Sequence, residues 1–203
     1  MDLVPRFPRD LGAAAANLGD KVRRRPIADL RQMPRTRIER TEHATLYRYD
    51  AAPGVRSHGR PLLLVPPLAA PALAFDLRRG GSVVEYLVQQ GRTVYLVDYG
   101  PVNFRHKDLG IEHWVDTVLP AAVESTVEHS GADAVHLAGW SLGGIFTIFT
   151  TAAHPLLPIA SATAVASPFD LRAVPLLALA RPLDAVGGQL VGATYRTLGG
   201  VPA

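Results

Sequence analysis

The feature that most constrains this chain is a short apolar stretch that leads directly into Gly-Trp-Ser-Leu-Gly at residues 139–143. Residues 134–138 have the composition of a buried strand, and residues 142–153 are compatible with a helix. A Gly-x-Ser-x-Gly pattern at such a junction is typical of a nucleophile elbow, a strained turn that projects the serine hydroxyl from the end of a sheet. A β-carbon at Gly139 or Gly143 would crowd that turn. The sequence therefore predicts Ser141 as a nucleophile; the plainer alternative is a glycine turn with an unreactive serine.

Strand-like and helix-like segments alternate on both sides of this junction. Such alternation requires a mostly parallel sheet with helices on both faces, so the predicted fold class is α/β. Residues 36–42 and 45–49 alternate in polarity around a short turn and predict an N-terminal antiparallel hairpin. Pro120 should kink or shorten the helix that contains it. The predicted parallel strands are residues 61–65, 93–98, 134–138 and 161–166, and the predicted helices are residues 76–90, 111–129 and 142–153.

Length and composition favour one domain with a sizeable core. The chain has 203 residues, of which 48% are hydrophobic. No uninterrupted apolar run is long enough to span a bilayer, and the first residues lack the apolar core of a secretory signal. Cysteine is absent, which excludes disulfides and a cysteine nucleophile. These features predict a cytoplasmic protein without a transmembrane segment.

Positive charge is concentrated at the N-terminus, where residues 1–60 contain 13 Lys/Arg and 7 Asp/Glu. We divide the chain into a basic N-terminal arm at 1–33, a core at 34–171 and an apolar, lid-like segment at 172–203. The densest basic run, residues 21–26, has no interleaved aromatic residues of the kind that stack on nucleic-acid bases. We therefore expect no nucleic-acid binding, but a weak attraction to an anionic membrane or granule surface.

Several segments beyond the elbow resemble one protein family as a set. Together they are similar to segments of the polyhydroxyalkanoate synthases, especially the class III catalytic subunit, over roughly residues 34–172. The resemblance implies the α/β-hydrolase fold, acyl-transfer chemistry and an acyl ester or acyl thioester substrate. The segments are residues 34–36, 46–49, 63–67, 75–78, 82–91, 95–100 and 167–170.

The nucleophile departs from that family. The synthases use a cysteine where this chain has Ser141. A thiolate is a good nucleophile and leaving group for passing a growing chain between thioesters, whereas a serine ester suits transfer to water or an alcohol. We therefore expect a serine acyl hydrolase or acyltransferase that acts on apolar acyl chains, rather than a polymerase.

The catalytic triad also departs from the family. In α/β hydrolases the serine is followed by the acid and then by the histidine. The only histidine after Ser141 is His154, near the far end of the next helix, and Asp170 and Asp184 are the only acids. Asp170 is the candidate acid, although the resemblance makes it a structural residue. The fold is therefore expected to be C-terminally incomplete.

This incompleteness supports a second hypothesis. The chain would then be a non-catalytic, truncated synthase-like protein or a partner-binding subunit. Its last parallel strand, residues 161–166, would be an exposed edge. Such an edge favours pairing with a protein partner or with a second copy of the chain.

The remaining site residues follow from the expected elbow. The oxyanion hole is predicted from the backbone N–H of Leu142 and one from the loop after residues 61–65, at Leu68 or Ala69. Trp140 and Leu68 are predicted to provide apolar pocket walls, with ordinary packing as the alternative. Asp98, at a strand end, is a weaker candidate for the site. The histidines lack metal-ligand spacing and no phosphate loop is present, so neither a metal nor a cofactor is expected.

Overall fold

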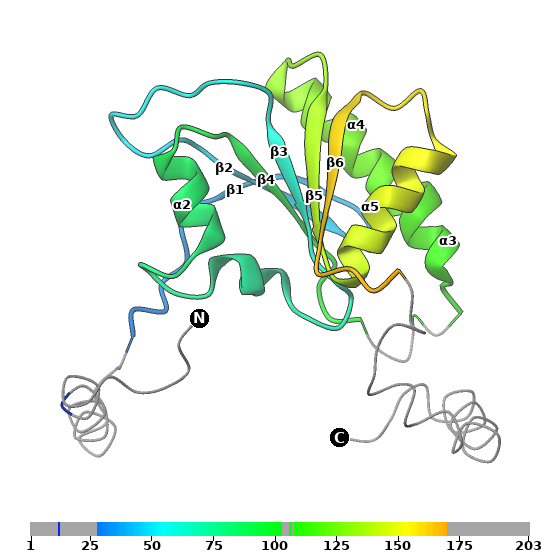
Figure 1. The fold of residues 1–203 in the computed structure, drawn as a ribbon, viewed down its shortest axis with the longest axis horizontal. Coiled ribbons are helices and arrows are strands. Elements are labelled where there is room, and N and C mark those ends of the chain that lie inside the picture. The colour runs from blue at the N-terminus through cyan, green and yellow to red at the C-terminus, as the bar shows by residue number, and fades with distance from the viewer. Residues whose placement is uncertain (1–11, 13–27, 103–105, 107, 170–203) are drawn as a thin grey trace.

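The computed structural model describes residues 28–102, 106 and 108–169, together with residue 12. Its centre is a six-stranded sheet in the order β1-β2-β4-β3-β5-β6. Figure 1 shows α2 on one side of this sheet and α3, α4 and α5 on the other. The N-terminal arm up to residue 27 and the lid-like segment lie outside the described residues.

The predicted hairpin is confirmed. Strand β1 (Thr36–Arg40) pairs antiparallel with β2 (Thr45–Tyr49), and a bulge interrupts their register between Arg37 and Glu39. Strand β2 also pairs antiparallel with β4 (Val94–Asp98), which attaches the hairpin to the rest of the sheet.

The other strands pair in parallel, also as predicted. Strand β3 (Leu62–Val65) lies between β4 and β5 (Val135–Trp140), and β5 pairs with β6 (Ile159–Val165). The sheet is therefore mostly parallel with an antiparallel start. Because these parallel strands end at the same edge, the loops that follow β3, β4, β5 and β6 gather there.

Two apolar cores cover the two faces of the sheet. Alternate strand residues such as Leu63, Tyr95 and Leu137 pack against α4 (Leu119–Ser130) and α5 (Leu142–Ala153). Their neighbours, including Leu64 and Leu96, pack with α2 (Val83–Gln89). This alternation follows from the two-residue period of a strand.

The helix predicted over 76–90 begins later than expected. A short 3₁₀ turn, η1 (Ala72–Asp76), precedes α2, and Ser82 caps α2 by accepting a hydrogen bond from the backbone N–H of Glu85 at 2.9 Å. The Ser82 hydroxyl in turn donates to the buried Asp76 carboxylate at 2.7 Å. The same carboxylate accepts the backbone N–H of Met33 at 2.7 Å. Asp76 therefore fixes the turn before the helix instead of starting the helix.

The helix predicted over 111–129 is divided. It begins as α3 (Ile111–His113), widens into a π-helical stretch, η3 (Trp114–Val118), and continues as α4 with Pro120 in its first turn. Proline has no backbone N–H, so Pro120 leaves a carbonyl oxygen of the preceding turn without its helical donor. The hydroxyl of Thr150 on α5 donates to the Val115 carbonyl oxygen at 3.0 Å, which satisfies a buried acceptor of the π stretch.

Candidate active site

Ser141 sits at a strained turn between β5 and α5. Its backbone has φ 53° and ψ −121°, which is unusual for a residue with a β-carbon. Its N–H donates to the carbonyl oxygen of Val165 at 2.8 Å, so the end of β6 holds the turn from one side. Its side chain makes no capping hydrogen bond to α5. The geometry is that expected of a nucleophile elbow.

The glycines around Ser141 are required by close backbone contacts. A β-carbon added at Gly139 would overlap the backbone of Gly143, on the first turn of α5. One added at Gly143 would overlap the carbonyl oxygen of Val65 and lie 2.6 Å from that of Pro66. The start of α5 therefore lies directly against the end of β3. Close backbone contacts at Gly139 and Gly143, rather than the conformational freedom of glycine, therefore account for the presence of glycine at these two positions.

The same contact brings the two predicted oxyanion donors to one region. Leu142 begins α5, where the first N–H groups of a helix have no partners within the helix. Leu68 and Ala69 lie in the loop after β3, beside the contact between Gly143 and Pro66. Leu68 and Ala69 line a cavity of about 240 Å³, and Asp98 lines the same cavity from the end of β4. Asp98 accepts the N–H of Gly100 at 3.0 Å, so its carboxylate also holds a turn.

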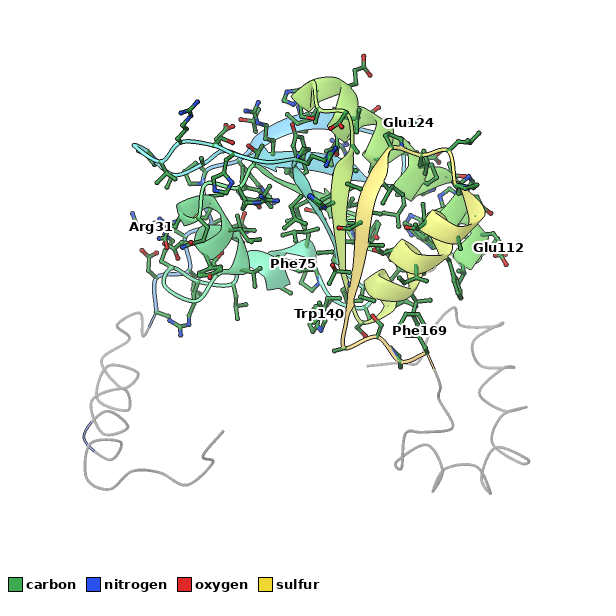
Figure 2. All side chains as sticks on the ribbon, turned by 45° about the horizontal axis from the view of Figure 1, so that its top comes forward. Arg31, Phe75, Glu112, Glu124, Trp140 and Phe169 are labelled. Carbon is green, nitrogen blue, oxygen red and sulfur yellow. The ribbon has the colours of Figure 1, made fainter. Side chains whose placement is uncertain are left out.

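Trp140 lines a different, apolar cavity. This cavity has a volume of about 430 Å³ and lies between α2 and the sheet. The Trp140 ring is 38% exposed and meets Phe75 edge to face, with ring centroids 6.4 Å apart. Figure 2 places Trp140 and Phe169 at the same end of the sheet. Trp140 lines this cavity, whereas Leu68 lines the cavity beside Asp98. We call the Trp140 cavity the apolar groove; its lining residues are Leu62, Leu64, Ala74, Phe75, Val83, Leu87, Ala138, Gly139, Trp140 and Val165.

All seven histidines of the sequence lie in the described part of the chain, and His154 is the only one that follows Ser141. His154 follows the last residue of α5, and a helix of that length spans about 18 Å. Its ring nitrogen lies 2.9 Å from the Asp116 carboxylate, at the opposite end of α5 from Ser141. This agrees with the position expected from the sequence, near the far end of the helix that follows Ser141. Asp170, the candidate acid, lies outside the described residues.

The other histidines have separate roles. Three make single polar contacts away from the elbow: His58 with the carbonyl oxygen of Gln90, His129 with Tyr95, and His136 with Ser161. His43, His106 and His113 instead form one cluster of rings, with the centroids of His43 and His113 4.6 Å apart. We call these three residues the histidine cluster.

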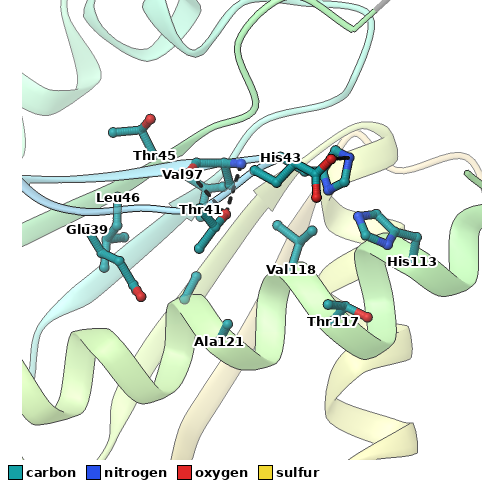
Figure 3. Close-up of a pocket in the computed structure, with 13 residues that line it drawn as sticks. Glu39, Thr41, His43, Thr45, Leu46, Val97, His113, Thr117, Val118 and Ala121 are labelled. Atoms are coloured by element: carbon teal, nitrogen blue, oxygen red, sulfur yellow. Dashed lines mark hydrogen bonds and ion pairs between the residues drawn. The ribbon is translucent and has the colours of Figure 1, made fainter. Parts of the chain in front are cut away.

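The histidine cluster borders a cavity of about 260 Å³ between the hairpin and α4 (Figure 3). Burial, together with the nearby His43 ring, lowers the pKa of His113 below its ordinary value. Its buried Nε2 atom has no hydrogen-bond partner. Ser141 does not line this cavity.

Ser167 is a site residue that sequence reasoning did not single out. Its hydroxyl donates to the carbonyl oxygen of Ser141 at 2.9 Å. The sequence marks Ser167 only through its place in the Ser-Pro-Phe-Asp segment at 167–170, one of the segments that carry the family resemblance.

No three His, Asp or Glu side chains of the described residues are grouped so that they could hold a metal ion. None of the helices in that part of the chain has the length and apolar character needed to cross a bilayer.

Several known proteins with sequences similar to this chain are named poly(3-hydroxyalkanoate) polymerase subunit PhaC. No protein-family model matches the chain. The poly(3-hydroxyalkanoate) polymerase subunit PhaC of Allochromatium vinosum is 27% identical over 150 residues, covering 73% of this chain and 41% of that protein. PhaC of Thiocystis violacea is 27% identical over 60% of this chain and 34% of its own length. PhaC of Cupriavidus necator is 31% identical over 56% of this chain and 20% of its own length. The chain thus matches less than half the length of each of these relatives.

Solved structures that superpose on part of this chain include proteins named as a lipase and as an alpha/beta hydrolase. The mature lipase BlEst2 of Bacillus licheniformis has a TM-score of 0.47 and 17% identity, covering 61% of this chain and 46% of that one. Alpha/beta hydrolase domain-containing protein 10 from mouse has a TM-score of 0.42 and 16% identity, covering 62% of this chain and 46% of that one.

Proposed function

We propose that this chain, which has the α/β-hydrolase fold and is similar to poly(3-hydroxyalkanoate) polymerases, performs acyl transfer at Ser141 as a serine acyl hydrolase or acyltransferase. The observation that carries the proposal is the strained backbone of Ser141 between β5 and α5, with φ 53°. Such strain in a residue with a β-carbon persists only where surrounding contacts enforce it, and it is concentrated at functional sites. Here the Ser141 N–H donates to Val165 and its carbonyl oxygen accepts the Ser167 hydroxyl, while Gly139 and Gly143 allow close backbone packing beside it.

The reaction uses one side-chain oxygen and a few backbone donors. The Ser141 hydroxyl oxygen attacks the acyl carbonyl carbon while a base removes the hydroxyl proton. The carbonyl electron pair moves to oxygen, and the N–H groups of Leu142 and of Leu68 or Ala69 stabilise the oxyanion. When the intermediate collapses, the alcohol or thiol leaves with the proton from the base. Water or an alcohol then attacks the acyl-serine and releases Ser141.

The apolar groove supports an apolar acyl group as substrate. Trp140 is adjacent to Ser141 in the chain and forms part of the groove wall, together with Phe75 and Val165. The Val165 carbonyl oxygen also accepts the Ser141 N–H. An acyl chain that leaves the Ser141 ester over Trp140 would therefore enter an apolar groove rather than water.

The base for this step is not one of the histidines whose hydrogen bonds lie elsewhere. His58, His129, His136 and His154 contact Gln90, Tyr95, Ser161 and Asp116. Loss of a triad member lowers the rate by about 10⁴–10⁶-fold, with oxyanion and binding effects remaining. We therefore assign binding, attack and oxyanion stabilisation to this chain, and proton removal to an imidazole supplied in addition.

The serine distinguishes this proposal from polymerisation. The relatives are named polymerases, whereas an alkoxide is a poorer leaving group than a thiolate for repeated exchange between acyl carriers. We propose single transfers to water or to an alcohol. The acyl donor is an ester or thioester of an apolar acid.

Turnover of a medium-chain nitrophenyl ester tests the proposal. We expect the wild-type chain to be slow and to be accelerated by added imidazole, beyond the reaction of imidazole with the ester in solution. Ser141→Ala should remove the protein-dependent part completely, while Ser130→Ala, a change on the exposed end of α4, should leave it intact. Equal imidazole-dependent rates in wild type and Ser141→Ala would overturn the proposal.

A non-catalytic, partner-binding role is the second candidate function. It is favoured by one observation: His154, the only histidine that follows Ser141 in the sequence, contacts Asp116 at the far end of α5. That role predicts no Ser141-dependent turnover in the presence of imidazole, and stable binding to a protein partner by the Ser141→Ala variant as well as by wild type.

A further inference from the structure

A polar cavity lies at the edge of the sheet where the parallel strands begin. Pro61, Thr93 and Ala132, which line it, precede β3, β4 and β5. Ser141 follows β5, and Figure 1 shows the connections before and after β5 at opposite edges of the sheet. The cavity has a volume of about 200 Å³, whereas one water molecule takes up about 30 Å³ of the liquid. We call it the basal cavity; its polar lining residues are Arg48, Ser57, Thr93, Tyr95, His129 and Ser130.

Arg48 brings a guanidinium group with unused donors to the basal cavity. It lies opposite Tyr95 in the pairing of β2 with β4, so both side chains are on the face of the sheet that α4 covers. Its Nη2 atom is 2.5 Å from the Asp50 carboxylate. Its Nε atom is buried and has no hydrogen-bond partner among the described residues. A guanidinium has five N–H donors, and a buried donor left without an acceptor is costly. Asp50 therefore satisfies only part of this group.

His129 supplies a second donor from the end of α4. Its Nδ1 atom lies 2.8 Å from the Tyr95 hydroxyl oxygen. Burial raises the pKa of Tyr95, which therefore keeps its hydroxyl hydrogen. With that hydrogen directed at Nδ1, the hydrogen of the neutral imidazole is on Nε2, and in the protonated ring Nε2 is a donor as well. Nε2 makes no hydrogen bond with a described residue and so remains available.

Ser57 and Thr93 add a hydroxyl donor from the loop before β3 and the start of β4. Their side-chain oxygens are 2.8 Å apart, and either oxygen can be the donor. Each hydroxyl has one hydrogen, so whichever hydroxyl accepts keeps its own hydrogen for another acceptor. Donors from a strand, a helix and a loop therefore line the same cavity, and no Asp or Glu is among its described lining residues.

The charge beside the basal cavity also favours an anion. Arg92 donates to the carbonyl oxygen of Arg60 at 3.3 Å and has no carboxylate partner among the described residues. Its Nη1 atom lies close to Gly59, a lining residue, because an added β-carbon there would be 2.5 Å away. Arg60 is paired with Asp133 at 2.6 Å. The carbonyl end of α4 opposes an anion, so the attraction must come from the guanidinium groups.

We propose that the basal cavity binds a phosphate group, as inorganic phosphate or as a phosphate monoester, with Arg48, His129 and the hydroxyl pair of Ser57 and Thr93 as its donors. The oxygens of a phosphate dianion are acceptors, which matches a lining of donors without carboxylates. A tetrahedral group can accept from a strand, a helix and a loop at once, whereas a planar carboxylate suits a single guanidinium. The site is separate from Ser141 and does not depend on the reaction proposed there.

Thermal melting of the full chain with added anions tests the site. A ligand that binds only the folded chain raises the melting temperature with its concentration. We expect a saturable rise with sodium phosphate and with glycerol phosphate, measured against sodium chloride of equal ionic strength, and no such rise with sodium acetate. A larger response to glycerol phosphate than to phosphate would identify the monoester as the form bound. No rise beyond chloride would overturn the proposal, as would an equal response to acetate.

Arg48→Gln should weaken phosphate binding by about tenfold or more, because it removes charge-assisted hydrogen bonds. Arg37→Gln, the same change at an exposed residue of β1, should bind like wild type. General stabilisation by phosphate as a salt would instead persist in every variant.

A pair of changes at the exposed Ser57 decides the outcome even if Arg48→Gln does not fold. Ser57→Asp places a carboxylate at the basal cavity and should abolish the phosphate response. Ser57→Asn has nearly the same size without the charge and should keep most of it. Wild-type phosphate affinity in Ser57→Asp, with the fold intact, would overturn the assignment of this cavity.

Discussion

The hydroxyl of Ser167 donates a hydrogen bond to the backbone carbonyl oxygen of Ser141 at 2.9 Å. The same oxygen accepts the backbone N–H groups of Gly144 at 3.0 Å and Ile145 at 3.3 Å. A β-carbon at Gly144 would overlap the Ser167 hydroxyl, so the glycine makes room for this contact. The strained turn is thus held by β6 and the residues after it, as well as by β5 and α5.

Ser167→Ala should weaken the turn without removing any proposed reacting group. Removal of one such hydrogen bond costs about 1 kcal/mol of stability. We expect that loss in denaturant unfolding, together with slower reaction of Ser141 with a fluorophosphonate. Ser130→Ala is the matched control, because its hydroxyl donates to Val127 in its own helix and accepts the N–H of Ala132 in the turn that follows, far from the elbow. Unchanged Ser141 reactivity in Ser167→Ala would show that the contact does not position the elbow.

Gly143→Ala should be strongly destabilising, because the added methyl group would overlap the backbone of Val65 and Pro66. Overpacking of this kind costs about 1–3 kcal/mol and here acts on backbone atoms that have little freedom to move. Gly131→Ala provides the control. Gly131 has a positive φ, 67°, and its β-carbon would meet no atom within 4 Å, whereas Gly143 is helical and is limited by contact. Denaturant unfolding should show the larger loss at Gly143; an equal or smaller loss there would show that the contact with Val65 and Pro66 does not require glycine.

The elements of the fold that could be predicted from sequence are those set by local pattern. The hairpin, the parallel strands and the helix over 142–153 follow from alternation, apolar runs and the Gly-Trp-Ser-Leu-Gly junction. The start of α2 could not be predicted in this way. It depends on the buried Asp76 carboxylate, which binds Ser82 and the backbone of Met33, 43 residues earlier in the chain.

The candidate site could be predicted only in part, for a similar reason. The elbow is encoded within five residues, so its position follows from sequence. The partition of Trp140 and Leu68 into separate cavities depends on the direction of each side chain relative to the sheet. The π-helical stretch before Pro120 depends on a hydrogen bond from Thr150 to Val115 across two helices. Contacts between segments distant in sequence decide both features.

His154→Ala should leave the reaction of Ser141 with a fluorophosphonate unchanged, although His154 is the only histidine that follows the serine. Its ring contacts Asp116 at the far end of α5. We expect at most a small loss of stability, because this is a surface pair. Asp116→Asn is the companion variant and should behave in the same way. Loss of Ser141 labelling in both variants, with folding intact, would show that this pair does serve the serine.

The histidine cluster should make stability depend on pH. The lowered pKa of His113 means that the folded chain binds this proton less tightly than the unfolded chain does. The free energy of unfolding should therefore fall as the pH decreases through the ordinary histidine value toward the lower folded value, and be unaffected by His113 above it. The nearby His43 and His106 act in the same direction on His113, whereas Glu42 opposes them.

His113→Gln should reduce this dependence. Urea unfolding at about pH 7.5 and about pH 5.5 should show a smaller difference in stability for His113→Gln than for wild type. His58→Gln, a change far from the cluster, should retain the wild-type difference. An unchanged pH dependence in His113→Gln would contradict the account of the cluster.

Intact-protein mass spectrometry after exposure to a fluorophosphonate tests the central claim most directly. The account predicts one adduct on the wild-type chain, mapped to Ser141, formed faster with added imidazole and absent in Ser141→Ala. A folded wild-type chain that remains unlabelled with and without imidazole, or one labelled equally in Ser141→Ala, would contradict the assignment of Ser141 as the nucleophile.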